Sequence, residues 1–121
     1  MRFSARVRQQ GQVSVLDLSG HLTSFESSGL RDTISGLLKQ GRKNIILNLS
    51  GLLYLDSSGI GELARNYVTV VKRGGVMKVV GLTPKIEEIL KIIQLHQIFQ
   101  EFSDEEAALR SFPESLNKRN F

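Results

Sequence analysis

The sequence predicts an α/β fold: a mixed, mostly parallel sheet of four or five strands with about four helices packed on it. Three observations support this expectation. Short β-branched, apolar runs alternate with longer segments in which apolar residues recur every three or four positions. The first two runs follow each other across a Gln-Gly-Gln turn, which is typical of an antiparallel hairpin. The later runs are separated by helical segments, which places those strands in parallel.

The composition fits a single domain without disulfides or a membrane anchor. The 121 residues are 40% hydrophobic and 23% charged and include no cysteine, which indicates one globular core. No apolar segment approaches the ~20 residues that span a bilayer, and no apolar signal core follows Met1. We therefore expect one domain over residues 1–113, a polar tail over 114–121, a cytoplasmic location and no membrane partner.

The charge of the chain does not predict a nucleic-acid partner. The net charge is +4 and the isoelectric point is about 9.7, but the basic residues are dispersed and only 7% of residues are aromatic. Single-stranded nucleic-acid binders interleave basic residues with stacking aromatics, and no such tract is present. Arg2, Arg6 and Arg8 alternate with apolar residues, which favours the solvated face of a strand. A contact surface for an acidic partner is the alternative.

The first half of the chain predicts strands over 3–9, 13–18 and 44–49, with a helix between the last two. Thr23 and Glu26 form a Thr-x-x-Glu capping box at the start of that helix. Apolar residues at 30, 34, 37 and 38 then follow the helical period. Gly41 suits the C-terminal cap of the helix.

The second half continues the alternation. It predicts, in order, a helix over 57–72 ended by Gly74-Gly75, a strand over 76–81, a helix beginning at Thr83-Pro84, an edge strand or linker over 97–102, and a last helix that begins at a Ser103/Glu106 capping box and ends near Pro113.

The most informative segment is Tyr54-Leu55-Asp56-Ser57-Ser58-Gly59-Ile60-Gly61, between an apolar strand and a helix. It places two hydroxyls and a carboxylate at a helix N-terminus, where backbone N–H groups are unpaired and the dipole is positive. Such a position tolerates an added phosphate, so the segment indicates a covalent switch. The alternative is that Asp56, Ser57 and Ser58 only cap the helix. Tyr54 is expected to be a packed residue rather than an interface anchor.

The same segment does not predict an enzyme. A hydrolase nucleophile elbow needs Gly-x-Ser-x-Gly, and Leu55 stands where the first glycine belongs. A Gly-x-x-x-x-Gly-Lys phosphate loop is absent. The two histidines, His21 and His96, have no cysteine or carboxylate at metal-ligand spacing. We therefore expect no catalytic residue, no metal and no cofactor.

Residues 13–112 resemble a STAS domain, and specifically a bacterial anti-anti-sigma factor, also called an anti-sigma factor antagonist. The resemblance is densest over 45–61, where an apolar strand leads into an aromatic-x-Asp-Ser-Ser-Gly-aliphatic-Gly segment and a helix. The Lys72-Arg73-Gly74-Gly75 turn and the Thr83-Pro84 helix start also fall where this family has them. The resemblance implies the STAS-type fold.

The resemblance also implies a mechanism. Members bind an anti-sigma factor that is itself a serine kinase, which frees the sigma factor. The kinase then phosphorylates the serine after the aspartate, here Ser57, and the phosphorylated antagonist lets go until a metal-dependent serine phosphatase restores it. Ser58 is the alternative acceptor. We expect a monomer or a weak dimer, and a partner-binding surface made of His21, Thr23, Asp56, Ser57, Ser58, Gly59, Ile60 and Gly61. The two glycines are expected to let a partner backbone approach closely.

One departure from the family keeps a second function open. The loop after the second strand usually carries Gly-x-Leu-Asp in this family, whereas this chain has Gly20-His21-Leu22-Thr23. Threonine can cap a helix as aspartate does, but a carboxylate near Ser57 is lost. The alternative function is therefore a non-phosphorylated STAS scaffold or subunit module in a signalling or lipid-transport complex.

Overall fold

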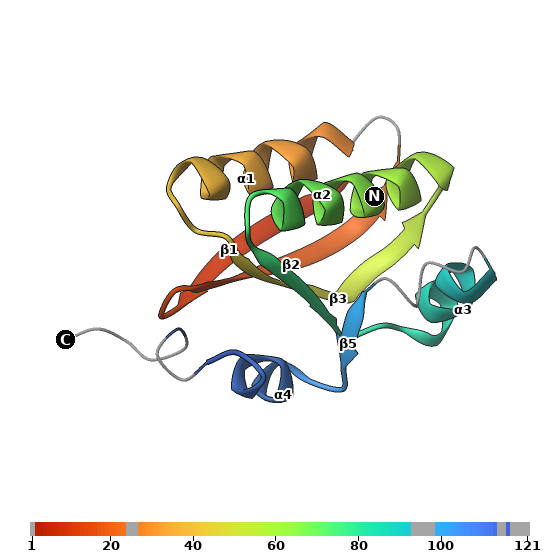
Figure 1. Ribbon diagram of the computed structural model, residues 1–121. Helices are drawn as coiled ribbons and strands as arrows, with labels where there is room; N and C mark the ends of the chain where they lie inside the picture. Colours follow the sequence, from red (N-terminus) through yellow and green to blue (C-terminus); the bar gives the residue numbers. More distant parts are fainter. Residues whose placement is uncertain (1, 24–26, 93–98, 114–115, 117–121) are drawn as a thin grey trace.

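A computed structural model of the chain describes residues 2–23, 27–92, 99–113 and 116, and the fold within them is a five-stranded sheet with four helices (Figure 1). The strands are β1 (Ser4–Gln10), β2 (Val13–Leu22), β3 (Asn44–Leu55), β4 (Val76–Val80) and β5 (Gln100–Phe102), in the spatial order β1-β2-β3-β4-β5. β1 pairs antiparallel with β2, and the other neighbours pair in parallel. The helices are α1 (Ser27–Lys39), α2 (Ser57–Lys72), α3 (Pro84–Ile92) and α4 (Glu105–Arg110). The predicted α/β fold is confirmed, and the segment before Phe102 forms a short edge strand rather than a linker.

The sheet is covered on both faces. α1 and α2 lie side by side on one face, and α4 lies on the other (Figure 1). Leu16 and Leu47 belong to the main core, whereas their neighbours Val15 and Ile46 belong to a second, smaller cluster with Ala108 of α4. Strands buried on both faces need apolar residues at successive positions. This requirement explains the unbroken apolar run at the start of β3.

The central strands are longer than predicted. β2 continues to Leu22 and β3 to Leu55, although the alternating pattern indicated ends near 18 and 49. The β2–β3 register shifts between Asp17 and Ser19 and again between Gly20 and His21. Along β3 the buried residues after Leu49 therefore recur every third position rather than every second. Where the two-residue alternation of buried and exposed side chains is interrupted, the sequence pattern no longer indicates a strand.

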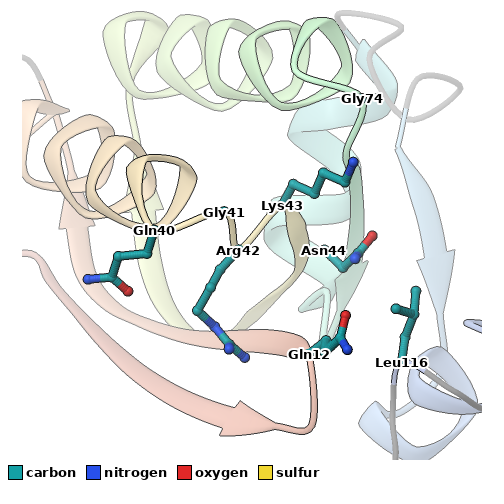
Figure 2. Close-up of a pocket in the computed structure, with 8 residues that line it drawn as sticks. All are labelled: Gln12, Gln40, Gly41, Arg42, Lys43, Asn44, Gly74 and Leu116. Atoms are coloured by element: carbon teal, nitrogen blue, oxygen red, sulfur yellow. The ribbon is translucent and has the colours of Figure 1, made fainter.

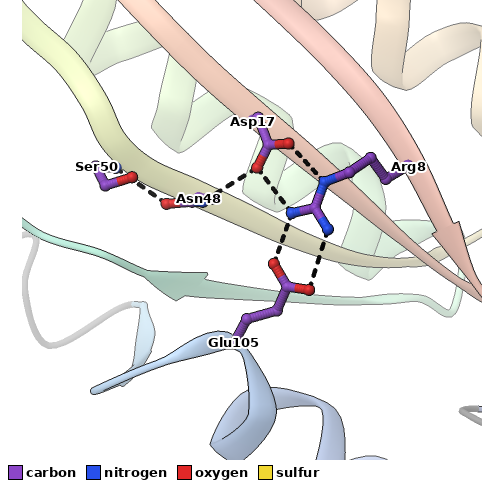
Figure 3. Close-up of polar contacts among 5 residues, drawn as sticks. All are labelled: Arg8, Asp17, Asn48, Ser50 and Glu105. Atoms are coloured by element: carbon purple, nitrogen blue, oxygen red, sulfur yellow. Dashed lines mark hydrogen bonds and ion pairs between the residues drawn. The ribbon is translucent and has the colours of Figure 1, made fainter.

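An arginine joins the sheet to α4 (Figure 3). Arg8 donates through Nε and Nη2 to the Asp17 carboxylate at 2.6 and 2.9 Å. Its Nη1 and Nη2 also donate to the Glu105 carboxylate at 3.2 and 2.6 Å, and Asn48 donates to Asp17 at 3.0 Å. The hydrogen bonds from Arg8 are the main reason that the pKa of Asp17 lies below its usual value. The alternating pattern predicted a solvated strand face for Arg8. That prediction is wrong, because Arg8 is bound by two carboxylates.

A buried lysine also fastens α4 and the segment after it. Lys78 on β4 is buried, and burial lowers its pKa. Its Nζ lies 4.2 Å from the Phe112 ring centroid and 5.3 Å from that of Phe102, and it donates to Ser111 Oγ. Such contacts keep a desolvated ammonium partnered.

The helix caps agree with the sequence in part. Thr83 Oγ1 accepts from Ile86 N at 3.3 Å at the start of α3, and Gly41 follows α1 with a φ of 78°, as predicted. The last helix differs, because Asp104, not Ser103, is its N-cap and accepts from Ala107 N at 2.8 Å. The carboxylate of Asp104, one position after the predicted Ser103, caps the helix instead. Glu26 lies outside the described residues, as does most of the predicted polar tail, in which Leu116 accepts a hydrogen bond from Gln12 N at 2.7 Å.

Arg8→Ala should lower the free energy of unfolding by about 1.5–3 kcal/mol at neutral pH, the range typical of hydrogen bonds to charged groups. Because the folded-state pKa of Asp17 is depressed, its contribution is complete above about pH 4 and is lost as the pH falls through that lowered pKa. Urea unfolding between pH 2 and 7 measures both effects. Arg31→Ala, which removes an exposed arginine on α1, is the control and should stay near wild type. An Arg8→Ala curve parallel to wild type over the whole acid range would contradict this account.

Candidate functional site

The signature segment forms the junction between β3 and α2, and Asp56 organises it. Asp56 is the N-cap of α2, with extended backbone angles of −99° and −173°, and its Oδ1 accepts from Gly59 N at 2.8 Å. Its own N–H donates to the carbonyl oxygen of Leu22, at the end of β2, at 3.3 Å. Asp56 thus ends the strand, starts the helix and joins both to the neighbouring strand.

Because Asp56 supplies the cap, the two serines do not. Ser57 is exposed and Ser58 is half-buried, both in the first turn of α2. Neither hydroxyl makes a hydrogen bond to another described residue. The alternative that the serines only cap the helix is therefore wrong. What remains at this position is a free hydroxyl beside a carboxylate and the positive end of a 16-residue helix.

The two glycines of the segment have different roles. Gly59 is buried, and a Cβ atom added there would collide with the carbonyl group of Leu22. Its missing side chain lets α2 pack against the end of β2, so the expectation that Gly59 gives access to a partner backbone is wrong. Gly61 is half-buried, and its open side is covered by the guanidinium of Arg65.

His21, Tyr54 and Lys85 form a cluster beside this junction. The rings of His21 and Tyr54 meet edge to face at 5.8 Å, and Lys85 Nζ lies 5.5 Å from the Tyr54 ring centroid. Tyr54 is 40% exposed, so the prediction that it is a packed residue is wrong. Lys85 was not predicted as a site residue from the sequence. The signal for it was the Thr83-Pro84 helix start, which follows β4 and therefore lies at the sheet edge where β3 ends.

The remaining predicted site residues lie close to the junction but are less exposed than Ser57. Thr23 and His21 are half-buried at the end of β2, whose Leu22 binds Asp56. Ile60 is half-buried against the main core. Beside the junction the exposed apolar side chain is Leu53 on β3, at 49%, whereas the exposed Val68 and Val71 lie toward the other end of α2. The described surface thus combines a free serine hydroxyl with exposed apolar groups, which suits recognition by another protein.

A hollow of about 460 Å³ lies at the other end of β3 (Figure 2). Arg42, Lys43 and Asn44 line it together with Gln12 and Leu116. Asn44 begins β3 and Ser57 follows its end, so this hollow and the serines lie at opposite edges of the sheet. Arg42 is engaged there by Ser14 Oγ at 3.0 Å and Gly11 O at 2.8 Å.

Two further observations concern the described residues alone. They contain no group of three or more histidine, cysteine, aspartate or glutamate side chains arranged to hold a metal ion. None of their helices combines the length and apolarity needed to cross a bilayer.

Comparison with known proteins identifies the fold family. The family model of the STAS domain matches residues 4–108, most of the chain and all of the junction described above. The chain belongs to the STAS domain family. The predicted resemblance is confirmed.

The relatives of this STAS domain include proteins with a regulatory name. An anti-sigma F factor antagonist of Paenibacillus polymyxa is 26% identical over 110 residues, which cover 90% of this chain and 94% of the relative. The crystal structure of an anti-sigma factor antagonist from Mycobacterium paratuberculosis has a TM-score of 0.79 at 23% identity and covers 90% of this chain and 92% of its own. The structure of the Bacillus cell fate determinant SpoIIAA in its phosphorylated form has a TM-score of 0.67 at 23% identity and covers 91% and 99%.

Gly59→Ala should destabilise this STAS domain by about 1–3 kcal/mol, the usual cost of overpacking a filled site, because its Cβ meets the Leu22 carbonyl. Gly36→Ala is the matched control. Gly36 lies inside α1 with no neighbouring atom within 4 Å of an added Cβ, so the helix propensity of alanine should stabilise it by up to about 1 kcal/mol. Thermal and urea unfolding measure both. Equal effects from the two substitutions would show that the β2–α2 contact is not as close as described.

Proposed function

We propose that this STAS domain is an anti-sigma factor antagonist: it binds an anti-sigma factor that is also a serine kinase, and phosphorylation of Ser57 ends that binding. The observation that carries the proposal is the state of Ser57. Its hydroxyl is exposed in the first turn of α2 and is not used by the cap, because Asp56 occupies that role. The names of the relatives agree with this function.

The geometry accounts for a switch that changes binding but not the fold. A phosphate on Ser57 adds a charge of about −1.5 to −2 at pH 7. The helix N-terminus favours that charge, so the isolated domain tolerates it. In a complex the phosphate lies beside Asp56 and next to the exposed apolar groups Leu53 and Tyr54. Covering it with a partner surface that fits the unmodified serine desolvates and repels the new charge.

The other parts of the proposal follow from this switch. The partner contacts Ser57 together with the exposed parts of the junction and of the cluster formed by His21, Tyr54 and Lys85. A serine phosphatase acts on the phosphorylated form. Ser58 is the less favourable acceptor, because it is half-buried whereas Ser57 is exposed. The domain itself performs no catalysis and acts in control of transcription through its partner.

Thr23 favours a second candidate function, a scaffold or subunit STAS module that is not phosphorylated. Thr23 is half-buried directly after Leu22, whose carbonyl binds the Asp56 N–H. The family aspartate at this position would place a second carboxylate near Ser57. If kinase recognition needs that carboxylate, Thr23→Asp should increase phosphorylation of Ser57, whereas a scaffold would gain none.

Ser57→Asp should weaken binding to the anti-sigma partner at least tenfold, while the free energy of unfolding stays within about 1 kcal/mol of wild type. Ser57→Ala should bind like wild type and resist the kinase. Isothermal titration calorimetry with the anti-sigma factor of the same host measures both.

Ser103→Asp is the matched control for this experiment. Ser103 is exposed and adjoins Asp104, the N-cap of α4, but it lies at a different helix. It should leave the affinity unchanged. A Ser57→Asp protein that binds as tightly as Ser103→Asp would refute the switch.

A further inference from the structure

A buried carboxylate lies one turn after the serines on α2. The side chain of Glu62 is 2% exposed, although glutamate is among the residues least often buried. Its Oε1 accepts a hydrogen bond from Arg65 Nε at 3.1 Å and forms an ion pair with Arg65 Nη2 at 3.0 Å. Its Oε2 has no hydrogen-bond partner in the described part of the chain. Arg65 is therefore the cation that partners this buried charge.

This pairing fixes the direction of the arginine. The Arg65 side chain is 67% exposed, and an exposed arginine is ordinarily free to move. Here Nε and Nη2 are both held by Glu62. Among the described residues, Nη1 makes no hydrogen bond. One side of the guanidinium fork is thus occupied, and the other side has two unused N–H donors.

The free side of the fork lies over Gly61. A Cβ atom added to Gly61 would be 3.2 Å from Nη1, 3.5 Å from Nη2 and 3.6 Å from Cζ of Arg65. Gly61 is four residues after Ser57 and three after Ser58, so it shares a helix face with both serines. Gly61 has no side chain to separate the guanidinium from the first turn of the helix. This packing gives Gly61 a role within the domain.

We propose that Arg65 binds the phosphate of phosphorylated Ser57, with Glu62 as the positioning residue that holds the guanidinium in place. The inference rests on the proposed phosphorylation of Ser57. The Nη1 donors reach along the Gly61 face toward the phosphate, while Nε and Nη2 stay on Glu62. A guanidinium that bridges two anions satisfies both without losing its own partner.

The consequence concerns the charge of the phosphate. A free phosphoserine has a second pKa near 6, so part of it is monoanionic close to neutral pH. A cation held nearby stabilises the dianion and lowers that pKa. Arg65 thus keeps the modified serine in its most repulsive form toward a partner surface. The Asp56 carboxylate next to Ser57 acts in the opposite direction and raises the pKa of the phosphate. The positive charge of Arg65 offsets this effect.

The experiment uses the full chain with phosphoserine incorporated at position 57 during translation, which needs no kinase. The second pKa of the phosphate is followed by ³¹P NMR titration. Arg65→Gln should raise that pKa by about half a unit or more, and Gly61→Ala should raise it by less, because its Cβ crowds Nη1. Lys72→Gln, an exposed cation at the far end of α2, is the control and should leave it unchanged.

Arg65→Gln leaves Glu62 buried without its cation, so this variant can unfold. The same comparison is then made between Glu62→Gln and the double variant Glu62→Gln/Arg65→Gln, both of which remove the uncompensated carboxylate and keep Asp56. Loss of Arg65 should again raise the phosphate pKa. If the phosphate has the same pKa in these two variants while both are folded, the proposal that Arg65 binds the phosphate is overturned. Because the phosphate is installed without a kinase, this outcome is separate from whether a cellular kinase modifies Ser57.

Discussion

The close contact between Gly59 and the Leu22 carbonyl is the constraint on which the site depends. A residue with a side chain at 59 would push the start of α2 away from the end of β2. The same Leu22 carbonyl accepts the N–H of Asp56, and Asp56 in turn caps Gly59. Three backbone or short side-chain contacts therefore fix the first turn of the helix against two parallel strands. These contacts hold the backbone on both sides of Ser57, whose side chain is exposed.

The residues that stabilise the sheet are separate from Ser57, the residue proposed to be phosphorylated. Arg8 binds both Asp17 and Glu105 on the face covered by α4, whereas α1 and α2 cover the opposite face (Figure 1). The exposed serine lies at the edge of the sheet and contributes no hydrogen bond to either layer. A charge added there changes the surface, while the packed layers keep their contacts. Such a separation is what a protein needs if modification is to change its partner and not its fold.

The sequence predicted most of the architecture because its apolar patterns and caps are local. The hairpin, the helix from Ser57 to Lys72 and the helix start at Thr83-Pro84 all depend on neighbouring residues. The features that were missed depend on contacts between distant segments. The outer halves of β2 and β3 have shifted registers that break the alternation, and the Arg8–Glu105 pair joins residues 97 positions apart. At the site, the sequence indicated Asp56 as a possible helix cap, which the structure confirms, but it misjudged Gly59 and Tyr54. Whether a glycine faces solvent or a carbonyl is decided by the neighbouring strand.

The central claim, that the β3–α2 junction presents Ser57 as the acceptor, is tested most directly by mapping phosphate on the folded protein. The purified chain is incubated with ATP and an extract of its host cell, and peptide-level mass spectrometry locates the modification. The account predicts one phosphate, on Ser57, and none on the half-buried Ser58. Phosphate on Ser58 alone, or none at all in an extract with demonstrated serine kinase activity, would contradict it.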